Sequence, residues 1–193
     1  MNHLLTEVAS QNPSTLAIDE GPRTLTYNDI LEKADTLAQM IQKYPLEPNE
    51  AIAVIFGPSF EMVIAQVALL RLNLTSVPLN PGLPKLRIKK MLADIEVRYA
   101  IGSAEVEDLD LSIISTLTGD FESCQQISSS SQIIMKDPNC SHILYTSGST
   151  GKPKAVHITP ESLVNLATST SHSPQNNRQS RVDQQFGLRY FSF

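Results

Sequence analysis

The residues most able to do chemistry lie together at positions 145–154, where the chain reads Tyr-Thr-Ser-Gly-Ser-Thr-Gly-Lys-Pro-Lys. The two glycines let the backbone turn sharply and approach a ligand closely. Successive N–H groups in such a turn form a concave, partly positive surface that suits phosphate oxygens. The hydroxyls add donors, and the lysines add positive charge. The stretch therefore predicts a polyphosphate-binding loop, with the binding residues Thr146, Ser147, Gly148, Ser149, Thr150, Gly151, Lys152 and Lys154.

The spacing of this loop differs from that of a Walker A motif. A Walker A motif places four residues between its first glycine and its Gly-Lys pair, and Ser or Thr follows the lysine. In this chain two residues separate Gly148 from Gly151, and Lys152 is followed by Pro153. The spacing therefore excludes a P-loop GTPase or kinase. The remaining alternative is a Gly/Ser-rich surface turn that binds nothing; it is disfavoured because so many small, hydroxylated and cationic residues directly follow an apolar strand.

The same ten residues resemble the phosphate loop of the adenylate-forming (AMP-binding) superfamily, which includes acyl-CoA synthetases, luciferases and peptide-synthetase adenylation domains. Two further stretches strengthen the resemblance. Residues 25–30, Leu-Thr-Tyr-Asn-Asp-Ile, resemble an early Leu-Thr-Tyr-x-Glu-Leu element, and residues 69–81 resemble a segment that ends in Val-Pro-Leu-Asp-Pro. Together these stretches cover most of the chain from about residue 10. The resemblance is best to the amino-acid adenylation domains of non-ribosomal peptide synthetases.

The resemblance implies a reaction and its partners. Members of the superfamily join a carboxylate to ATP, release pyrophosphate, and pass the acyl group to a thiol of coenzyme A or of carrier-protein phosphopantetheine. ATP with Mg²⁺ is the implied cofactor, and a carboxylic or amino acid is the implied substrate. Amino-acid activation is the favoured function. An acyl- or aryl-CoA ligase fragment, and a non-catalytic nucleotide-binding or interaction remnant, remain open alternatives.

Several parts that the resemblance implies have no counterpart in the sequence. The Mg²⁺-binding glutamate, the ribose-binding aspartate and the catalytic lysine would all follow Phe193, so the catalytic residues are unknown. We therefore expect residues 1–193 to form a single partial, truncated AMP-binding domain that is incomplete for catalysis alone. Ala155 stands where the superfamily usually has glycine. If that position requires a positive φ, alanine costs about 1 kcal/mol.

The elements that position the loop follow a β/α alternation. Residues 51–56 are apolar throughout, as in a parallel strand covered on both faces. Helices over 60–72 and from Pro84 to Ile95 alternate with strands over 75–80 and 97–102, which predicts an α/β fold with a doubly wound, mostly parallel sheet. Other expected elements are a helix over 4–9, a strand over 15–19, a helix opened by a Thr26/Asp29 capping box, strands over 141–145 and 155–159, a helix from Pro160, and loops over 104–137 and 170–181.

Other polar residues are interpreted structurally. His142 and His157 alternate with apolar neighbours, which is typical of histidines held within a sheet. The basic residues Lys85, Arg87, Lys89 and Lys90 are expected on a solvated helix face.

The bulk composition narrows the function further. A length of 193 residues suits one domain, and a net charge of −5 favours neither a nucleic-acid nor a membrane partner. Two cysteines without metal-ligand spacing, and an N-terminus unlike a secretory signal, indicate a cytoplasmic protein.

Overall fold

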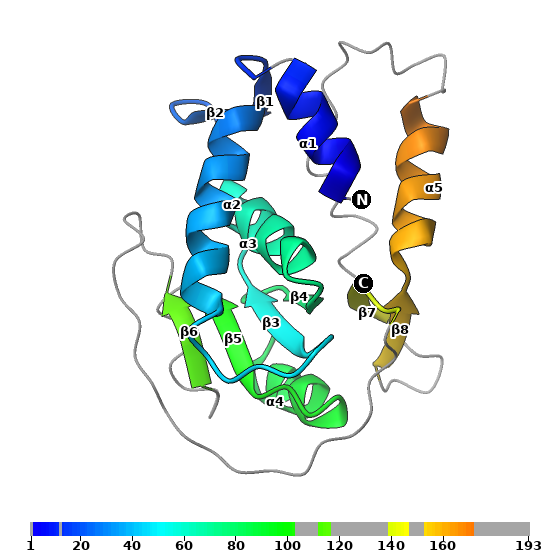
Figure 1. The fold of residues 1–193 in the computed structure, drawn as a ribbon. Coiled ribbons are helices and arrows are strands. Elements are labelled where there is room, and N and C mark those ends of the chain that lie inside the picture. Colours follow the sequence, from blue (N-terminus) through cyan, green and yellow to red (C-terminus); the bar gives the residue numbers. More distant parts are fainter. Residues whose placement is uncertain (1, 12, 103–111, 117–138, 147–152, 172–193) are drawn as a thin grey trace.

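The computed structural model describes residues 2–11, 13–102, 112–116, 139–146 and 153–171. Its helices and strands alternate along most of the chain (Figure 1). In order they are α1 (Asn2–Gln11), β1 (Leu16–Asp19), β2 (Thr24–Thr26), α2 (Tyr27–Ile41), β3 (Ala51–Ile55), α3 (Phe60–Arg71), β4 (Thr75–Leu79), α4 (Lys85–Asp94), β5 (Tyr99–Gly102), β6 (Ser112–Thr116), β7 (His142–Thr146), β8 (Lys154–Ile158) and α5 (Pro160–Ser171).

The central sheet has the strand order β6-β5-β3-β4-β7-β8. The pairs from β6 to β7 are parallel, and β8 alone returns antiparallel to β7. The chain moves from β3 to β4 through α3, then crosses back through α4 to β5 on the other side of β3. This is a doubly wound, mostly parallel α/β sheet, as the sequence predicted. The short β1–β2 hairpin forms a separate two-stranded sheet.

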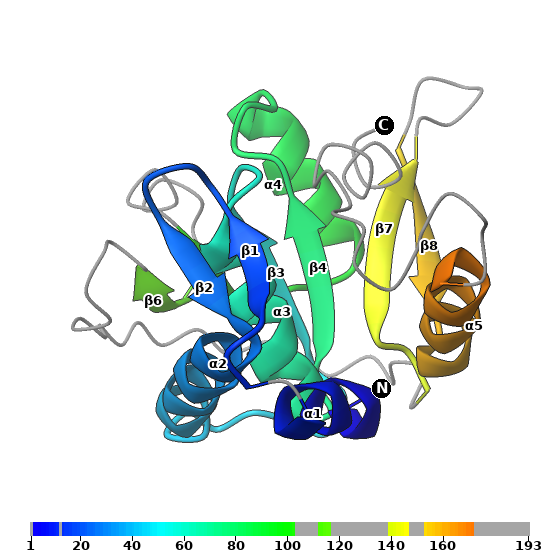
Figure 2. The ribbon, with the colours of Figure 1, turned by 90° about the horizontal axis from the view of Figure 1, so that it is seen from above.

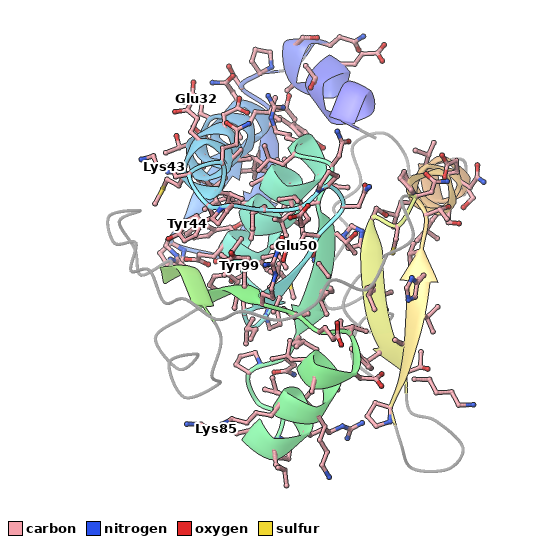
Figure 3. All side chains as sticks on the ribbon, turned by 60° about the horizontal axis from the view of Figure 1, so that its bottom comes forward. Glu32, Lys43, Tyr44, Glu50, Lys85 and Tyr99 are labelled. Carbon is pink, nitrogen blue, oxygen red and sulfur yellow. The ribbon has the colours of Figure 1, made fainter. Side chains whose placement is uncertain are left out.

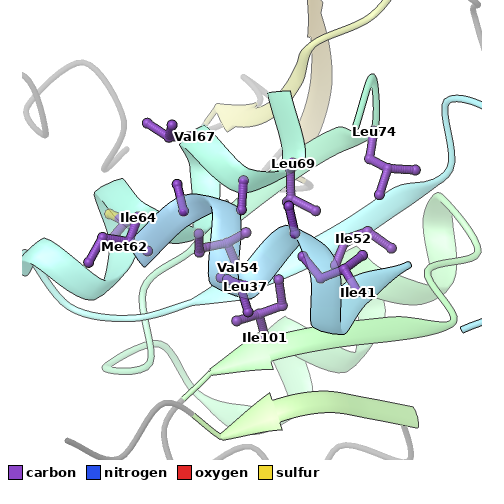
Figure 4. Close-up of a cluster of buried hydrophobic side chains, with 14 of the residues drawn as sticks. Leu37, Ile41, Ile52, Val54, Met62, Ile64, Val67, Leu69, Leu74 and Ile101 are labelled. Carbon is purple, nitrogen blue, oxygen red and sulfur yellow. The ribbon is translucent and has the colours of Figure 1, made fainter. Parts of the chain in front are cut away.

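Helices cover both faces of this sheet (Figures 1 and 2). On one face α2 and α3 pack against Ile52, Val54 and Ile101 and make the larger apolar cluster, shown in Figure 4. On the other face Ile88, Met91 and Leu92 of α4 pack against alternate residues of β3, β4, β5 and β7. All five residues of β3 are buried, because both of its faces are covered.

Helix α2 begins where the sequence predicted. The Asp29 backbone N–H donates to the Thr26 hydroxyl, and the Thr26 N–H donates to the Asp29 carboxylate at 2.8 Å, which completes the capping box. The hydrogen bond from the Thr26 backbone lowers the pKa of the Asp29 carboxyl below its usual value. Two otherwise unpaired backbone donors at the start of the helix are therefore satisfied locally.

A buried carboxylate ties together the amino ends of three strands. Glu50 is only 3% exposed, and its carboxylate accepts hydrogen bonds from Arg98 Nε at 2.7 Å and from the Glu47 N–H at 2.9 Å. Its backbone carbonyl accepts the N–H of Thr75 at 2.9 Å. Glu50 precedes β3, Thr75 opens β4 and Arg98 precedes β5, so this network fixes that edge of the sheet (Figure 3 labels Glu50 and Tyr99).

One prediction needs correction. The range 104–137 was expected to be a loop, yet β6 lies inside it and pairs in parallel with β5. Its Ser-Ile-Ile-Ser-Thr sequence is too short to show a clear period, and pairing with β5 decides its conformation. The remainder of that range, and positions 172–181 of the second expected loop, lie outside the described residues; positions 170 and 171 end α5.

Candidate functional site at the β7–β8 hairpin

The predicted phosphate loop connects two paired strands. Strands β7 and β8 are antiparallel neighbours, with Tyr145 opposite Ala155 and Thr146 opposite Lys154. Thr146 ends β7 at the carboxyl edge of the parallel sheet, the edge where α/β proteins bind ligands. Pairing of Thr146 with Lys154 fixes both ends of the intervening segment at this edge.

The two described members of the predicted binding set are accessible. Thr146 and Lys154 are both exposed, so the hydroxyl and the ammonium group are available to a ligand at the same end of the hairpin. The other predicted members, Ser147, Gly148, Ser149, Thr150, Gly151 and Lys152, lie outside the described residues. Their role as phosphate ligands stays a prediction.

Ala155 is accommodated without backbone strain. It lies in β8 opposite Tyr145, and it is absent from the non-glycine residues with positive φ, which are Asn49, Asn73 and Glu96 in the described ranges. The strand conformation suits any L-residue. The cost anticipated for alanine at this position therefore does not arise.

A buried tyrosine fastens the end of β7 to helix α4. The Tyr145 hydroxyl donates a hydrogen bond to the backbone carbonyl of Met91, which lies in the last turn of the helix. Carbonyls in a last helical turn lack partners within the helix, so the side chain supplies one. Burial raises the pKa of the Tyr145 hydroxyl, and the charge of Asp94 adds to this, so the hydroxyl stays a donor. No local pattern in the sequence indicated this contact.

The two sheet histidines differ in their surroundings. His142 is 4% exposed, and burial lowers its pKa from 6.5 to about 4, so it is neutral at physiological pH. It pairs across the sheet with Ser76, whose buried hydroxyl has no hydrogen-bond partner in the described part of the chain. His157 is exposed on β8. Neither histidine lies at the loop end of the hairpin, which agrees with their interpretation as structural residues.

The basic residues of α4 are not all solvated, contrary to the expectation from the sequence. Lys85 and Lys90 are exposed as predicted, but Arg87 and Lys89 are half-buried, and the Arg87 Nε is fully shielded from solvent. The turn before this helix is held by the Asn80 side chain, which accepts the Gly82 N–H at 2.8 Å. Sequence reasoning missed the burial of Arg87, although its position four residues before the buried Met91 indicated it.

A cavity of about 860 Å³ lies at the opposite, amino edge of the sheet. Its lining comes from the segments that precede β3, β4 and β7, among them Tyr44, Asn49, Leu74 and Ser141. It contains none of the residues predicted to bind phosphate. We place the candidate site at the hairpin because Thr146 and Lys154 are paired there, at the two ends of the predicted phosphate loop.

Within the described ranges, no three His, Cys, Asp or Glu side chains are grouped so as to hold a metal ion. Among the described helices, none has the length and apolar character needed to span a bilayer.

Comparison with known proteins decides the family. The family model described as "AMP-binding enzyme" matches residues 5–192. The chain belongs to the AMP-binding enzyme family. This AMP-binding domain is 31% identical over 187 residues to polyketide synthase PksN of Bacillus subtilis (strain 168), covering 90% of this chain and 3% of that protein. It is 28% identical over 194 residues to bacitracin synthase 3 of Bacillus licheniformis, covering 97% of this chain and 3% of that protein.

A solved structure agrees with this assignment. The AMP-binding domain superposes on the N-terminal subdomain of Klebsiella oxytoca NpsA, solved in complex with 3-hydroxyanthranilyl-AMSN, with a TM-score of 0.65 and 28% identity. The similarity covers 82% of this chain and 40% of that one. The chain thus spans a small fraction of the curated relatives and two-fifths of the solved subdomain.

Proposed function

We propose that this AMP-binding domain binds the triphosphate of ATP at the β7–β8 hairpin, as part of an enzyme that activates carboxylic acids as acyl adenylates. The observation that carries the proposal is the pairing of Thr146 with Lys154, which fixes both ends of a Gly-, Ser- and Lys-rich segment at the carboxyl edge of the sheet. Family membership supports a nucleotide ligand.

The chemistry explains why cations are needed at this place. A carboxylate oxygen attacks the α-phosphorus of ATP, the bond from that phosphorus to the bridging oxygen breaks, and pyrophosphate leaves with the bonding electrons. Negative charge builds on the departing pyrophosphate, and no proton has to move. Catalysis of such a step consists mainly of positioning and electrostatic stabilisation. Lys154 and Lys152 would neutralise the β- and γ-phosphates, and the hydroxyls of Thr146, Ser147, Ser149 and Thr150 would orient them.

The substrate is proposed to be an amino acid, and the acceptor a carrier-protein phosphopantetheine thiol. The relatives include bacitracin synthase 3, tyrocidine synthase 3 and subunits of linear gramicidin synthase, which supports the resemblance to peptide-synthetase adenylation domains. The NpsA complexes favour a second candidate, an aryl acid, because that subdomain was solved with 3-hydroxyanthranilyl- and 3-hydroxybenzoyl-AMSN. A coenzyme A thiol would be the acceptor in a ligase of the acyl- or aryl-CoA type.

Calorimetric titration with ATP tests the nucleotide site directly. Lys154→Ala removes one charge-assisted contact of about 1.5–3 kcal/mol, which corresponds to a loss of affinity of roughly 10- to 150-fold. Lys90→Ala is the matched control, because Lys90 is an exposed lysine on α4. Equal ATP affinity in the wild type, the Lys154 variant and the Lys90 variant would refute the site. In the longer protein, ATP–pyrophosphate exchange with panels of amino acids and aryl acids distinguishes the two substrate classes.

A further inference from the structure

Arg87 is an arginine without a carboxylate partner in the described structure. Its Nε is shielded from solvent and has no hydrogen-bond partner there. The other arginines of the described ranges each pair with at least one carboxylate: Arg23 with Glu20 and Glu61, Arg71 with Asp35, and Arg98 with Glu50. Shielding a guanidinium N–H from water without a partner is unfavourable, and such groups in native structures call for an explanation.

The position of Arg87 in the sequence of α4 sets the side of the helix on which it lies. It lies four residues before Met91, and therefore above Met91 on the same side of the helix. Met91 is the residue whose carbonyl accepts the Tyr145 hydroxyl, so this side of α4 faces β7. Arg87 thus shares a flank of the helix with the contact that fastens Tyr145.

The direction of the helix sets the height of Arg87 along β7. Helix α4 runs from the carboxyl end of β4 to the amino end of β5, opposite to the strands. One turn back from Met91 is about 6 Å toward the carboxyl edge, at about 1.5 Å per residue. A strand advances about 3.3 Å per residue, so Arg87 lies about two strand residues closer than Met91 to the carboxyl edge of the sheet. This is the edge at which Thr146 ends β7.

We propose that Arg87 is a further anion-binding residue, whose guanidinium donates to phosphate oxygens of the polyphosphate held at the ends of β7 and β8. The anion cluster then comprises Arg87, Thr146 and Lys154. Guanidinium N–H groups bind phosphate in a fixed planar geometry and add direction to the charge of a lysine. This inference rests on the proposed function, because it takes the bound anion to be the phosphates of the nucleotide.

Lys85 offers a matched comparison on the same helix. Figure 3 shows its side chain pointing away from β7 and β8, on the far flank of α4. Lys85→Met and Arg87→Met each remove one positive charge from the amino-terminal half of α4, and both keep an unbranched apolar side chain. Only the change at Arg87 removes a cation on the β7 flank.

The test is calorimetric titration of the whole chain with ATP, inorganic tripolyphosphate and adenosine. Arg87→Met is expected to weaken the binding of ATP and of tripolyphosphate at least about tenfold, and Arg87→Lys is expected to weaken it less. Lys85→Met is expected to change these affinities less than about twofold. Adenosine, which carries no phosphate, is expected to bind all variants equally. Without ligand, Arg87→Met is expected to melt at the wild-type temperature or above it, because no ion pair or side-chain hydrogen bond within the described residues is lost.

Each outcome separates this inference from the proposed function. If Arg87→Met binds ATP and tripolyphosphate as tightly as the wild type while Lys154→Ala binds them more weakly, Arg87 has no role in anion binding. The proposed nucleotide site at the hairpin then still stands. A lower melting temperature of ligand-free Arg87→Met, with the loss of affinity shared by adenosine, identifies Arg87 as a structural residue and also overturns the inference. No binding of ATP or tripolyphosphate by the wild type overturns both proposals.

Discussion

Substitution of Tyr145 by phenylalanine tests the contact that fastens the hairpin to α4. The change removes one hydroxyl and leaves the ring in place. Tyr145 is 7% exposed and Met91 is 4% exposed, so water does not readily replace the lost donor. A neutral hydrogen bond contributes about 0.5–1.5 kcal/mol, whereas leaving a buried carbonyl unpaired costs about 1–3 kcal/mol. The unpaired carbonyl dominates, and we expect a destabilisation of about 1–3 kcal/mol.

Urea denaturation followed by far-ultraviolet circular dichroism measures this loss. With a slope of about 2 kcal/mol per molar urea, the midpoint should fall by roughly 0.5–1.5 M while the slope stays unchanged. Tyr27→Phe is the control, because the described residues provide no hydrogen bond to the Tyr27 hydroxyl. Equal midpoints for the two variants would refute the reasoning, since the Tyr145 hydroxyl would then contribute nothing to stability.

Three other substitutions test the framework around the site. The folded chain resists protonation of His142 while the unfolded chain accepts it, so the unfolding free energy should fall by up to roughly 3 kcal/mol as the pH drops from 6.5 to about 4. Urea midpoints measured across this pH range should fall less in His142→Gln than in the wild type, because the variant lacks the titrating group. Arg98→Met leaves the Glu50 carboxylate buried without its cation and should cost about 3–5 kcal/mol, much of which a second change, Glu50→Gln, should restore in a double-mutant cycle. Thr26→Ala removes the cap of α2 and should lower the unfolding free energy by about 1 kcal/mol, against a negligible loss for Thr36→Ala on the exposed side of that helix.

Features encoded within a few neighbouring residues were predictable from the sequence. The apolar run of β3 predicted a strand covered on both faces, and all five of its residues are buried. The Thr26 and Asp29 pair predicted the start of α2, because a capping box needs only residues three apart. The composition of the phosphate loop also lies within ten consecutive residues, which is why the family was recognisable before the fold was known.

Features that depend on distant parts of the chain were not predictable. Arg98 meets Glu50 from 48 residues away, and Tyr145 meets Met91 from 54 residues away. Periodicity identifies which residues are buried but not which of them meet. Strand β6 escaped prediction because pairing with β5, rather than its own pattern, makes it a strand.

The antiparallel strand β8 distinguishes this site from a Walker A arrangement. In a Walker A arrangement the phosphate loop leads into a helix, whose N-terminal N–H groups and dipole favour the anion. In this chain β7 pairs with the antiparallel strand β8, which begins at Lys154. A lysine side chain therefore stands at the described end of β8, where it can face an anion. Lys154 lies on the returning strand itself, and α4 is the helix fastened to β7 through Tyr145. Arg87, one helical turn before Met91 on α4, is the cation that we propose to act together with Lys154 on the bound anion.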